Sequence, residues 1–89
     1  MPEITLTIRN AVGLHARPAA LFVQEASKYK AEIRVRKGDL VANAKSILSI
    51  LTLGADQGSV VVVSAEGEDA VRALAALQTL VDTDFGEPK

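Results

Sequence analysis

The chain has 89 residues, of which 48% are hydrophobic but only 3% aromatic, and a formal net charge of −1 at pH 7. This length fits one small domain whose core is filled by aliphatic side chains. The absence of cysteine excludes disulfides and thiolate metal sites, and the lack of a signal peptide or an apolar run of roughly 20 residues predicts a cytoplasmic protein without membrane insertion.

Charge is unevenly distributed along the chain. Residues 1–45 carry 8 basic and 4 acidic side chains, and residues 46–89 carry 2 and 7, so the halves have charges of +4 and −5. A basic cluster of this kind can bind nucleic acid, but a solvated charged face is the simpler interpretation. Since aromatic residues for base stacking are nearly absent, we expect no nucleic-acid partner. The basic cluster comprises Lys28, Lys30, Arg34, Arg36, Lys37 and Lys45.

The first half of the chain predicts a strand, a helix and a hairpin. Apolar and polar residues alternate over 4–8, which is typical of a strand with one buried face, and the turn-forming stretch 10–13 ends it. Apolar positions at helical spacing predict a first helix over 16–27. A second alternating stretch over 32–36 leads into the sequence KGD at 37–39, whose turn chemistry predicts a β-hairpin.

The second half predicts a short helix, a strand and a long helix. Ser46 and Gly54 bracket an apolar segment as N-cap and C-cap residues. The four valines at 60–63 are typical of a strand inside a sheet, and residues 68–82 have helical periodicity. The order βαββαβα predicts a two-layer sandwich of the α+β class, and residues 83–89 are expected to form a flexible tail.

The only histidine, His15, comes where the first helix begins. The first-turn N–H groups of a helix lack intrahelical partners. Pro18 has no backbone N–H, so the free donors nearest the ring are those of Ala16 and Arg17. These donors, the Arg17 guanidinium and the helix dipole form an anion site suited to phosphate. A neutral ring nitrogen of imidazole attacks phosphorus, and the phosphoramidate that forms leaves easily once it is protonated, so transfer can run both ways. We therefore predict that His15 accepts a phosphoryl group. A structural cap or a surface histidine is the alternative.

The short second helix has two features with alternative explanations. Ser46 is either an N-cap, worth about 1 kcal/mol, or a phosphorylation site, because a helix N-terminus tolerates phosphate. The helix also carries more apolar residues than one buried stripe requires. The surplus belongs either to the core or, if Leu48 and Leu51 are exposed beside Leu14, to a docking patch.

Two long motifs resemble the HPr family, the histidine-containing phosphocarriers of the bacterial phosphoenolpyruvate-dependent sugar phosphotransferase system. GLHARPAALFV around His15 is similar to the family's active-site signature, and NAKSILSILTLGADQGSVVVVSAEGEDA around Ser46 is similar to its second signature. The resemblance runs from Ile4 to about Val81. It implies a single HPr-like domain, 1–89, folded as an open-faced sandwich: a four-stranded antiparallel sheet with three helices on one face.

The resemblance also implies a function without turnover of its own and without a cofactor or metal. His15 would accept a phosphoryl group on Nδ1 from the phosphohistidine of enzyme I and pass it to a histidine of enzyme IIA. Arg17 would stabilise the phosphoryl group, while Ala16 and Pro18 shape the turn. The carrier is expected to be a monomer that uses one surface for both partners. That partner surface would comprise Leu14, Ile47, Leu48 and Leu51.

Several alternatives stay open. Ser46 matches the position that a dedicated HPr kinase/phosphorylase modifies in some bacteria, but Leu48 replaces the usual Met of kinase-regulated members and Ser49 the frequent Gly. A regulatory binding module acting through Ser46 would leave His15 without a role. A phosphocarrier of a nitrogen-related regulatory branch would instead keep phosphoryl transfer on His15. A small phosphatase using Arg17 would need a general base, and the sequence indicates no carboxylate or second histidine nearby.

Overall fold

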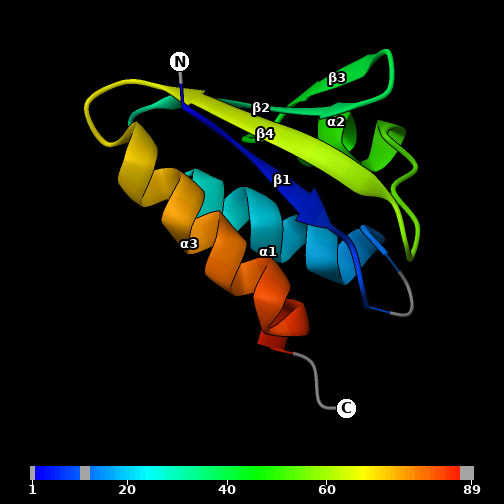
Figure 1. The fold of residues 1–89 in the computed structure, drawn as a ribbon. Coiled ribbons are helices and arrows are strands. Elements are labelled where there is room, and N and C mark those ends of the chain that lie inside the picture. The colour runs from blue at the N-terminus through cyan, green and yellow to red at the C-terminus, as the bar shows by residue number, and fades with distance from the viewer. Residues whose placement is uncertain (1, 11–12, 87–89) are drawn as a thin grey trace.

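The computed structural model describes residues 2–10 and 13–86, and these residues have the predicted order βαββαβα (Figure 1). None of the helices in this part of the chain is long and apolar enough to cross a membrane. The elements are β1 (Glu3–Thr7), α1 (Ala16–Ala26), β2 (Glu32–Lys37), β3 (Leu40–Asn43), α2 (Ile47–Thr52), β4 (Val60–Glu66) and α3 (Ala70–Asp82).

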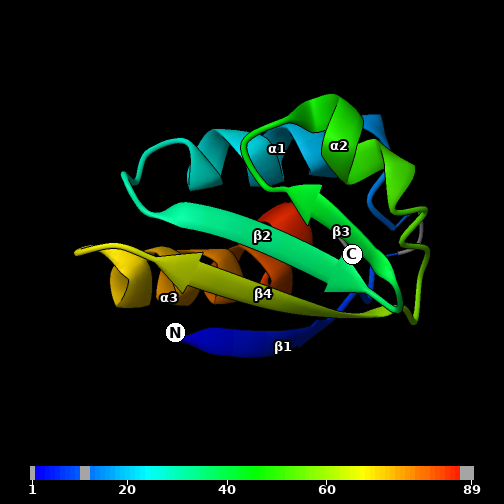
Figure 2. The same ribbon diagram turned by 90° about the horizontal axis from the view of Figure 1, so that it is seen from above.

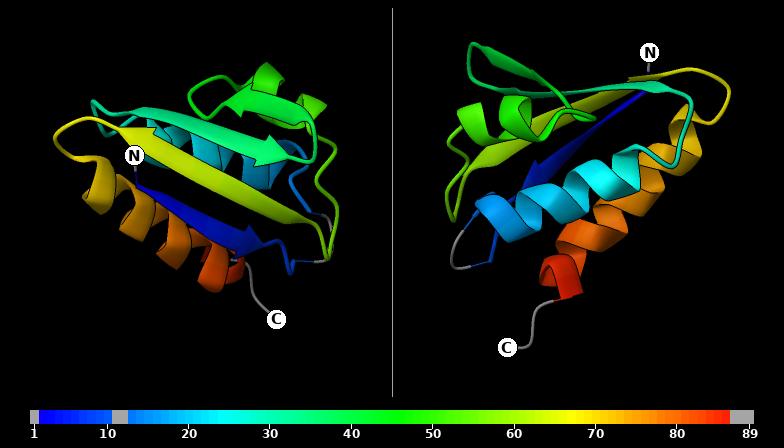
Figure 3. Two further views of the ribbon diagram at one scale, coloured as in Figure 1. Left: turned by 45° about the horizontal axis from the view of Figure 1, so that its top comes forward. Right: turned by 180° about the vertical axis from the view of Figure 1, so that it is seen from behind.

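The four strands form one antiparallel sheet in the order β1-β4-β2-β3. Helices α1 and α3 lie side by side against one face of this sheet, and α2 packs beside α1 and β3 (Figure 3). The other face is open, as the view from above shows, with β2 and β4 in the middle and α3 behind them (Figure 2). The predicted open-faced sandwich is therefore confirmed.

Alternation along the central strands explains why one face is buried and the other is not. In β2, Ile33 and Val35 are buried beneath the helices, whereas Arg34 between them is exposed. The valine run was predicted to lie inside a sheet, and it does, but only alternate members are buried: Val61 is in the core and Val60 is exposed. Strand β4 is thus paired with a neighbouring strand at both edges, whereas helices cover only one of its faces.

The C-terminal end differs from the predicted tail over residues 83–86. Helix α3 is followed by a 3-10 turn, Asp84–Gly86, in which Phe85 is only 3% exposed and joins the core. Asp84 and Phe85 adopt left-handed backbone angles, φ 52° and 59°, which are costly for residues with a Cβ. Burial of an aromatic ring offsets that cost, since a ring buries a large apolar area. Residues 87–89 lie outside the described residues.

The start of α3 holds the loop between α1 and β2 in place. The Asp69 carboxylate accepts hydrogen bonds from the backbone N–H groups of Lys30 at 2.8 Å and Ala31 at 2.9 Å. The hydrogen bond from Lys30 is the main cause that lowers the pKa of Asp69 below its ordinary value of 3.8. At Gly67, where φ is +144°, a Cβ would lie 2.9 Å from the Ala31 Cα, so glycine permits this approach.

We expect Asp69→Ala to lower the melting temperature at neutral pH by a few degrees, because two backbone N–H groups lose their acceptor. Folding lowers the pKa of Asp69, so its stabilising contribution is present above the ordinary value of 3.8 and is lost as the pH falls through the folded-state pKa. The difference in melting temperature between wild type and variant should therefore shrink as the pH falls below 3.8. Circular dichroism melts at several pH values measure this difference.

The matched control is Asp39→Ala, at an exposed position in the turn between β2 and β3. This variant should melt close to the wild type throughout the pH range. If the difference in melting temperature between wild type and Asp69→Ala stayed constant as the pH is lowered, the role assigned to the carboxylate would be contradicted.

Candidate functional site

His15 is the N-cap residue of α1, but its ring does not act as the cap. Its backbone is extended, with φ −80° and ψ −171°, and its carbonyl accepts the first helical hydrogen bond from the Ala19 N–H at 2.8 Å. The side chain makes no capping hydrogen bond and is exposed to solvent. The alternative of a structural cap therefore does not apply, and the ring is available for chemistry.

The backbone beside His15 offers two unpaired donors. The N–H groups of Ala16 and Arg17 have no hydrogen-bond partner within residues 2–10 and 13–86, and Pro18 follows them without an N–H. Pro18 is buried, so the turn that presents the donors is fixed by packing as well as by the proline ring. The positive end of the α1 dipole lies at the same place. Two free donors therefore lie where the sequence predicted them, and their binding of an anion beside the ring stays a prediction.

Arg17 is exposed, and its guanidinium forms no ion pair within the described part of the chain. It does not line the hollow into which His15 points. The sequence therefore placed Arg17 correctly at the helix N-terminus, but its side chain stays in solvent in the unmodified protein. An exposed arginine of this kind can turn toward an anion, since its rotamers are not held by neighbours.

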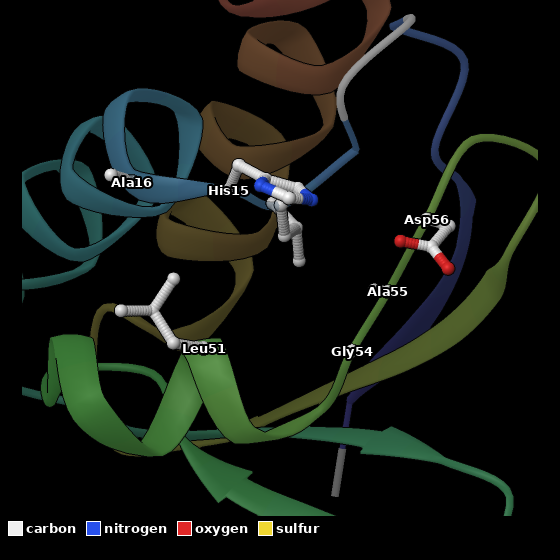
Figure 4. A pocket seen from close by; sticks show the side chains of 7 residues that line it. His15, Ala16, Leu51, Gly54, Ala55 and Asp56 are labelled. Atoms are coloured by element: carbon white, nitrogen blue, oxygen red, sulfur yellow. The ribbon is translucent and has the colours of Figure 1, made fainter.

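His15 lines a shallow hollow of about 300 Å³ formed by three chain segments (Figure 4). The first is the start of α1, the second is the last turn of α2, and the third is the loop that leads into β4. The lining residues are Leu14, His15, Ala16, Leu51, Gly54, Ala55 and Asp56.

A close backbone contact joins the first and third of these segments. The Leu14 N–H donates a 2.7 Å hydrogen bond to the Ala55 carbonyl. At Gly13, where φ is +62°, a Cβ would lie 2.4 Å from the Ala55 oxygen and 2.7 Å from the Asp56 Cα. Only a residue without a Cβ fits there, so the glycine that precedes the His15 segment lets the two loops meet.

Ala55 and Asp56 line the hollow although no sequence pattern predicted them as site residues. Neither residue belongs to a periodic pattern, and the two glycines nearby, Gly13 and Gly54, were explained as turn and C-cap residues. The structure also corrects one argument made against a phosphatase, namely that no carboxylate lies near His15. Asp56 lines the same hollow, 41 positions away along the chain, and reaches it through the contact with Gly13.

Ser46 is the N-cap of α2, as predicted. Its Oγ accepts a hydrogen bond from the Ser49 N–H at 3.3 Å, and the Ser49 Oγ accepts one from the Asn43 N–H at 3.0 Å. The side chain of Lys45 donates to the Tyr29 carbonyl at 2.6 Å. The segment between β3 and α2 is thus held by hydrogen bonds to its own neighbours and to the loop after α1, and Ser46 is half-buried within it.

The short helix α2 exposes part of its apolar surface. Ile47 and Leu51 are each 38% exposed and Leu48 is 75% exposed, whereas Ile50 is in the core. We call Ile47, Leu48 and Leu51 the α2 patch; Leu51 also lines the His15 hollow. Leu14 differs from the expected partner surface, because it is only 4% exposed. It lines the hollow with only a small part of its surface and otherwise packs in the core.

Four members of the basic cluster have partners within the described part of the chain. Lys28 and Arg34 each form an ion pair with a neighbouring glutamate, and Lys37 and Lys45 each donate to a backbone carbonyl. This distribution fits the interpretation as solvated charge and local hydrogen bonding.

Fold and site together match a known class, the phosphocarriers of the bacterial phosphotransferase system. Residues 2–83 match the family model described as the PTS HPr component phosphorylation site. The chain belongs to the HPr family, as the two sequence motifs predicted. Proteins of this family carry phosphoryl groups and are not catalysts with turnover of their own.

Individual relatives agree over the full length. The chain is 40% identical over 87 residues to phosphocarrier protein HPr of Neisseria meningitidis serogroup A, covering 98% of each protein. The crystal structure of HPr-C-His from Thermoanaerobacter tengcongensis matches with a TM-score of 0.96 and 53% identity over 100% of both chains. An HPr dimer from the same organism matches with a TM-score of 0.79 and 54% identity, covering 98% of this chain and 100% of that one.

We expect Gly13→Ala to destabilise the protein through the contact with the loop before β4. Left-handed φ costs alanine about 1 kcal/mol, and the clash with the Ala55 carbonyl adds roughly 1–3 kcal/mol. The control is Gly38→Ala, which has φ +58° but nothing within 4 Å of the added Cβ. Urea unfolding of both variants separates the two contributions. Equal losses of unfolding free energy would show that the close contact does not constrain the site.

Proposed function

We propose that this protein is a monomeric, cytoplasmic phosphocarrier that accepts a phosphoryl group on His15 from enzyme I and passes it to enzyme IIA. One observation supports this most directly. The His15 ring is exposed at the N-terminus of α1 without a hydrogen bond of its own, beside two backbone N–H groups that lack partners within residues 2–10 and 13–86. A nucleophile and a site for phosphoryl oxygens thus lie together.

The transfer step requires no net proton change. The unprotonated ring nitrogen of His15 attacks phosphorus as the P–N bond of the donor phosphohistidine breaks. The donor nitrogen keeps the electron pair of that bond, so one P–N bond replaces another. The N–H on the second nitrogen of each ring stays in place during the step. Because the bonds broken and formed are alike, the transfer runs in either direction.

The surroundings of His15 have distinct roles in this proposal. The Ala16 and Arg17 N–H groups donate to phosphoryl oxygens, and the α1 dipole favours their negative charge. The exposed Arg17 guanidinium turns toward the phosphoryl group and neutralises part of its charge. Pro18 holds the helical turn that presents both donors.

The α2 patch would be the shared docking surface. Leu51 lines the His15 hollow while Ile47 and Leu48 extend the exposed apolar area away from it. A partner that covers this patch excludes water there and brings its own histidine to the hollow. Since donor and acceptor would use the same patch, they bind in turn.

Ser46 carries a second, regulatory proposal. Phosphorylation by an HPr kinase/phosphorylase would add roughly two negative charges at neutral pH next to Ile47 in the patch. An acidic partner would then bind less tightly. The exposed, unpaired His15 favours the carrier over a regulatory module that acts through Ser46 alone.

The carrier proposal predicts that incubation with phosphoenolpyruvate and enzyme I adds one phosphoryl group, detected by intact-mass spectrometry. The added mass should disappear after brief mild acid, because phosphohistidine is acid-labile. The variant His15→Ala should gain nothing while melting like the wild type, since the ring is exposed and does not cap the helix. Retention of the labile label in this variant would contradict the proposal.

The docking proposal predicts that Leu48→Asp weakens transfer from enzyme I without affecting the fold. We expect the KM for the carrier to rise about tenfold or more, as for other exposed hot-spot residues. The matched control is Val71→Asp on α3, where the side chain is also largely exposed (69%). An unchanged KM for Leu48→Asp, or an equal rise for Val71→Asp, would show that enzyme I docks elsewhere.

A further inference from the structure

We propose that Asp56 lowers the stability of the phosphoryl group on His15 by charge repulsion, and so makes the protein a better phosphoryl donor. This rests on the proposed phosphorylation of His15 and names a further residue that determines its energetics. It does not follow from the two motifs, in which the His15 segment and the Asp56 segment are separate.

The backbone of Asp56 is fixed beside the His15 segment. Its Cα lies against Gly13 so closely that an added Cβ would be 2.7 Å away, and the preceding Ala55 carbonyl accepts from the Leu14 N–H. The Asp56 carbonyl accepts from the Ser59 N–H at 3.0 Å, which closes the turn into β4. The side chain therefore starts from a constrained position on the rim of the hollow.

The carboxylate lies across the hollow from the imidazole ring. Figure 4 shows the His15 ring on one side and the Asp56 oxygens on the other, with open space between them. The carboxylate forms no ion pair within residues 2–10 and 13–86. Among the described residues that line the hollow, Asp56 is the one with an acidic side chain, and none has a lysine or arginine side chain.

A phosphoryl group on His15 would bring further negative charge into this space. Histidine-bound phosphate has anionic oxygens, which repel a carboxylate on the opposite wall. The repulsion is absent before the phosphoryl group arrives and after it leaves, so it acts against the phosphorylated state alone. Asp56 then shifts the equilibrium toward donation, while the backbone donors of α1 oppose it. Charge interactions at exposed sites correspond to roughly a two- to fivefold change in an equilibrium constant.

The test is a competition between wild type and Asp56→Asn for one pool of phosphoryl groups. Both proteins are mixed in equal amounts, the wild type labelled with ¹⁵N to separate the masses, with limiting phosphoenolpyruvate and a catalytic amount of enzyme I. Enzyme I then exchanges phosphoryl groups between them until equilibrium, so differences in docking rate cancel. Intact-mass spectrometry gives the phosphorylated fraction of each protein.

We expect Asp56→Asn to hold the phosphoryl group about two- to fivefold more than the wild type at low salt. Since repulsion is screened by ions, the preference should shrink near 1 M salt, where the Debye length is about 3 Å. Asp56→Glu keeps the charge and should partition like the wild type. Glu68→Gln, which removes an exposed acid at the start of α3, should partition equally as well.

The outcomes distinguish this inference from the carrier proposal. Equal partition of Asp56→Asn and wild type, or a preference for the wild type, would overturn the role of Asp56 while leaving phosphorylation intact. A preference that persists unchanged at high salt, or that Glu68→Gln shares, would also overturn it. If neither protein gains an acid-labile phosphoryl group, the carrier proposal itself fails.

Discussion

The site depends on one close backbone contact, between the segment before α1 and the loop before β4. The Leu14 N–H donates to the Ala55 carbonyl at 2.7 Å, and Gly13 leaves space for that loop where any Cβ would clash. This contact fixes where α1 begins, and hence where the N–H groups of Ala16 and Arg17 point. It also brings the end of α2 and the loop into β4 against the His15 ring. Without this contact, the segments that line the hollow would not be held next to one another.

The sandwich supplies the rigidity that this contact requires. Phe22 of α1 and Leu77 of α3 belong to one buried core together with residues of β2 and β4, so a shift of α1 along the sheet would disturb that packing. The N-terminus of α1 lies at the edge of that core, where Pro18 is buried and His15 is exposed. An exposed histidine ring at a fixed helix terminus suits the proposed carrier, because the N–H groups that would hold the phosphate are preorganised while the ring stays accessible.

Much of the fold was predictable because its signals are local. Alternation in β2 and helical spacing in α1 each depend on neighbours within a few residues, and Ser46 and Gly54 bracket α2 through short-range hydrogen bonds. The donors beside His15 were predictable for the same reason. Asp56 was not, because only a tertiary contact brings it to the hollow. Burial of Phe85 was likewise hidden by the polar residues around it, and the burial of Leu14 depends on packing that no periodicity in its short loop indicates.

The central claim is that backbone N–H groups at the start of α1 hold a phosphoryl group on His15. The most direct test is a ¹H–¹⁵N correlation spectrum recorded before and after phosphorylation by enzyme I, together with a ³¹P spectrum. The account predicts a phosphohistidine ³¹P signal and, among the backbone amides, the largest downfield shifts at Ala16 and Arg17, all reverting as the phosphoryl group is lost. Amide shifts concentrated instead at the start of α2, with Ala16 and Arg17 unchanged, would contradict it.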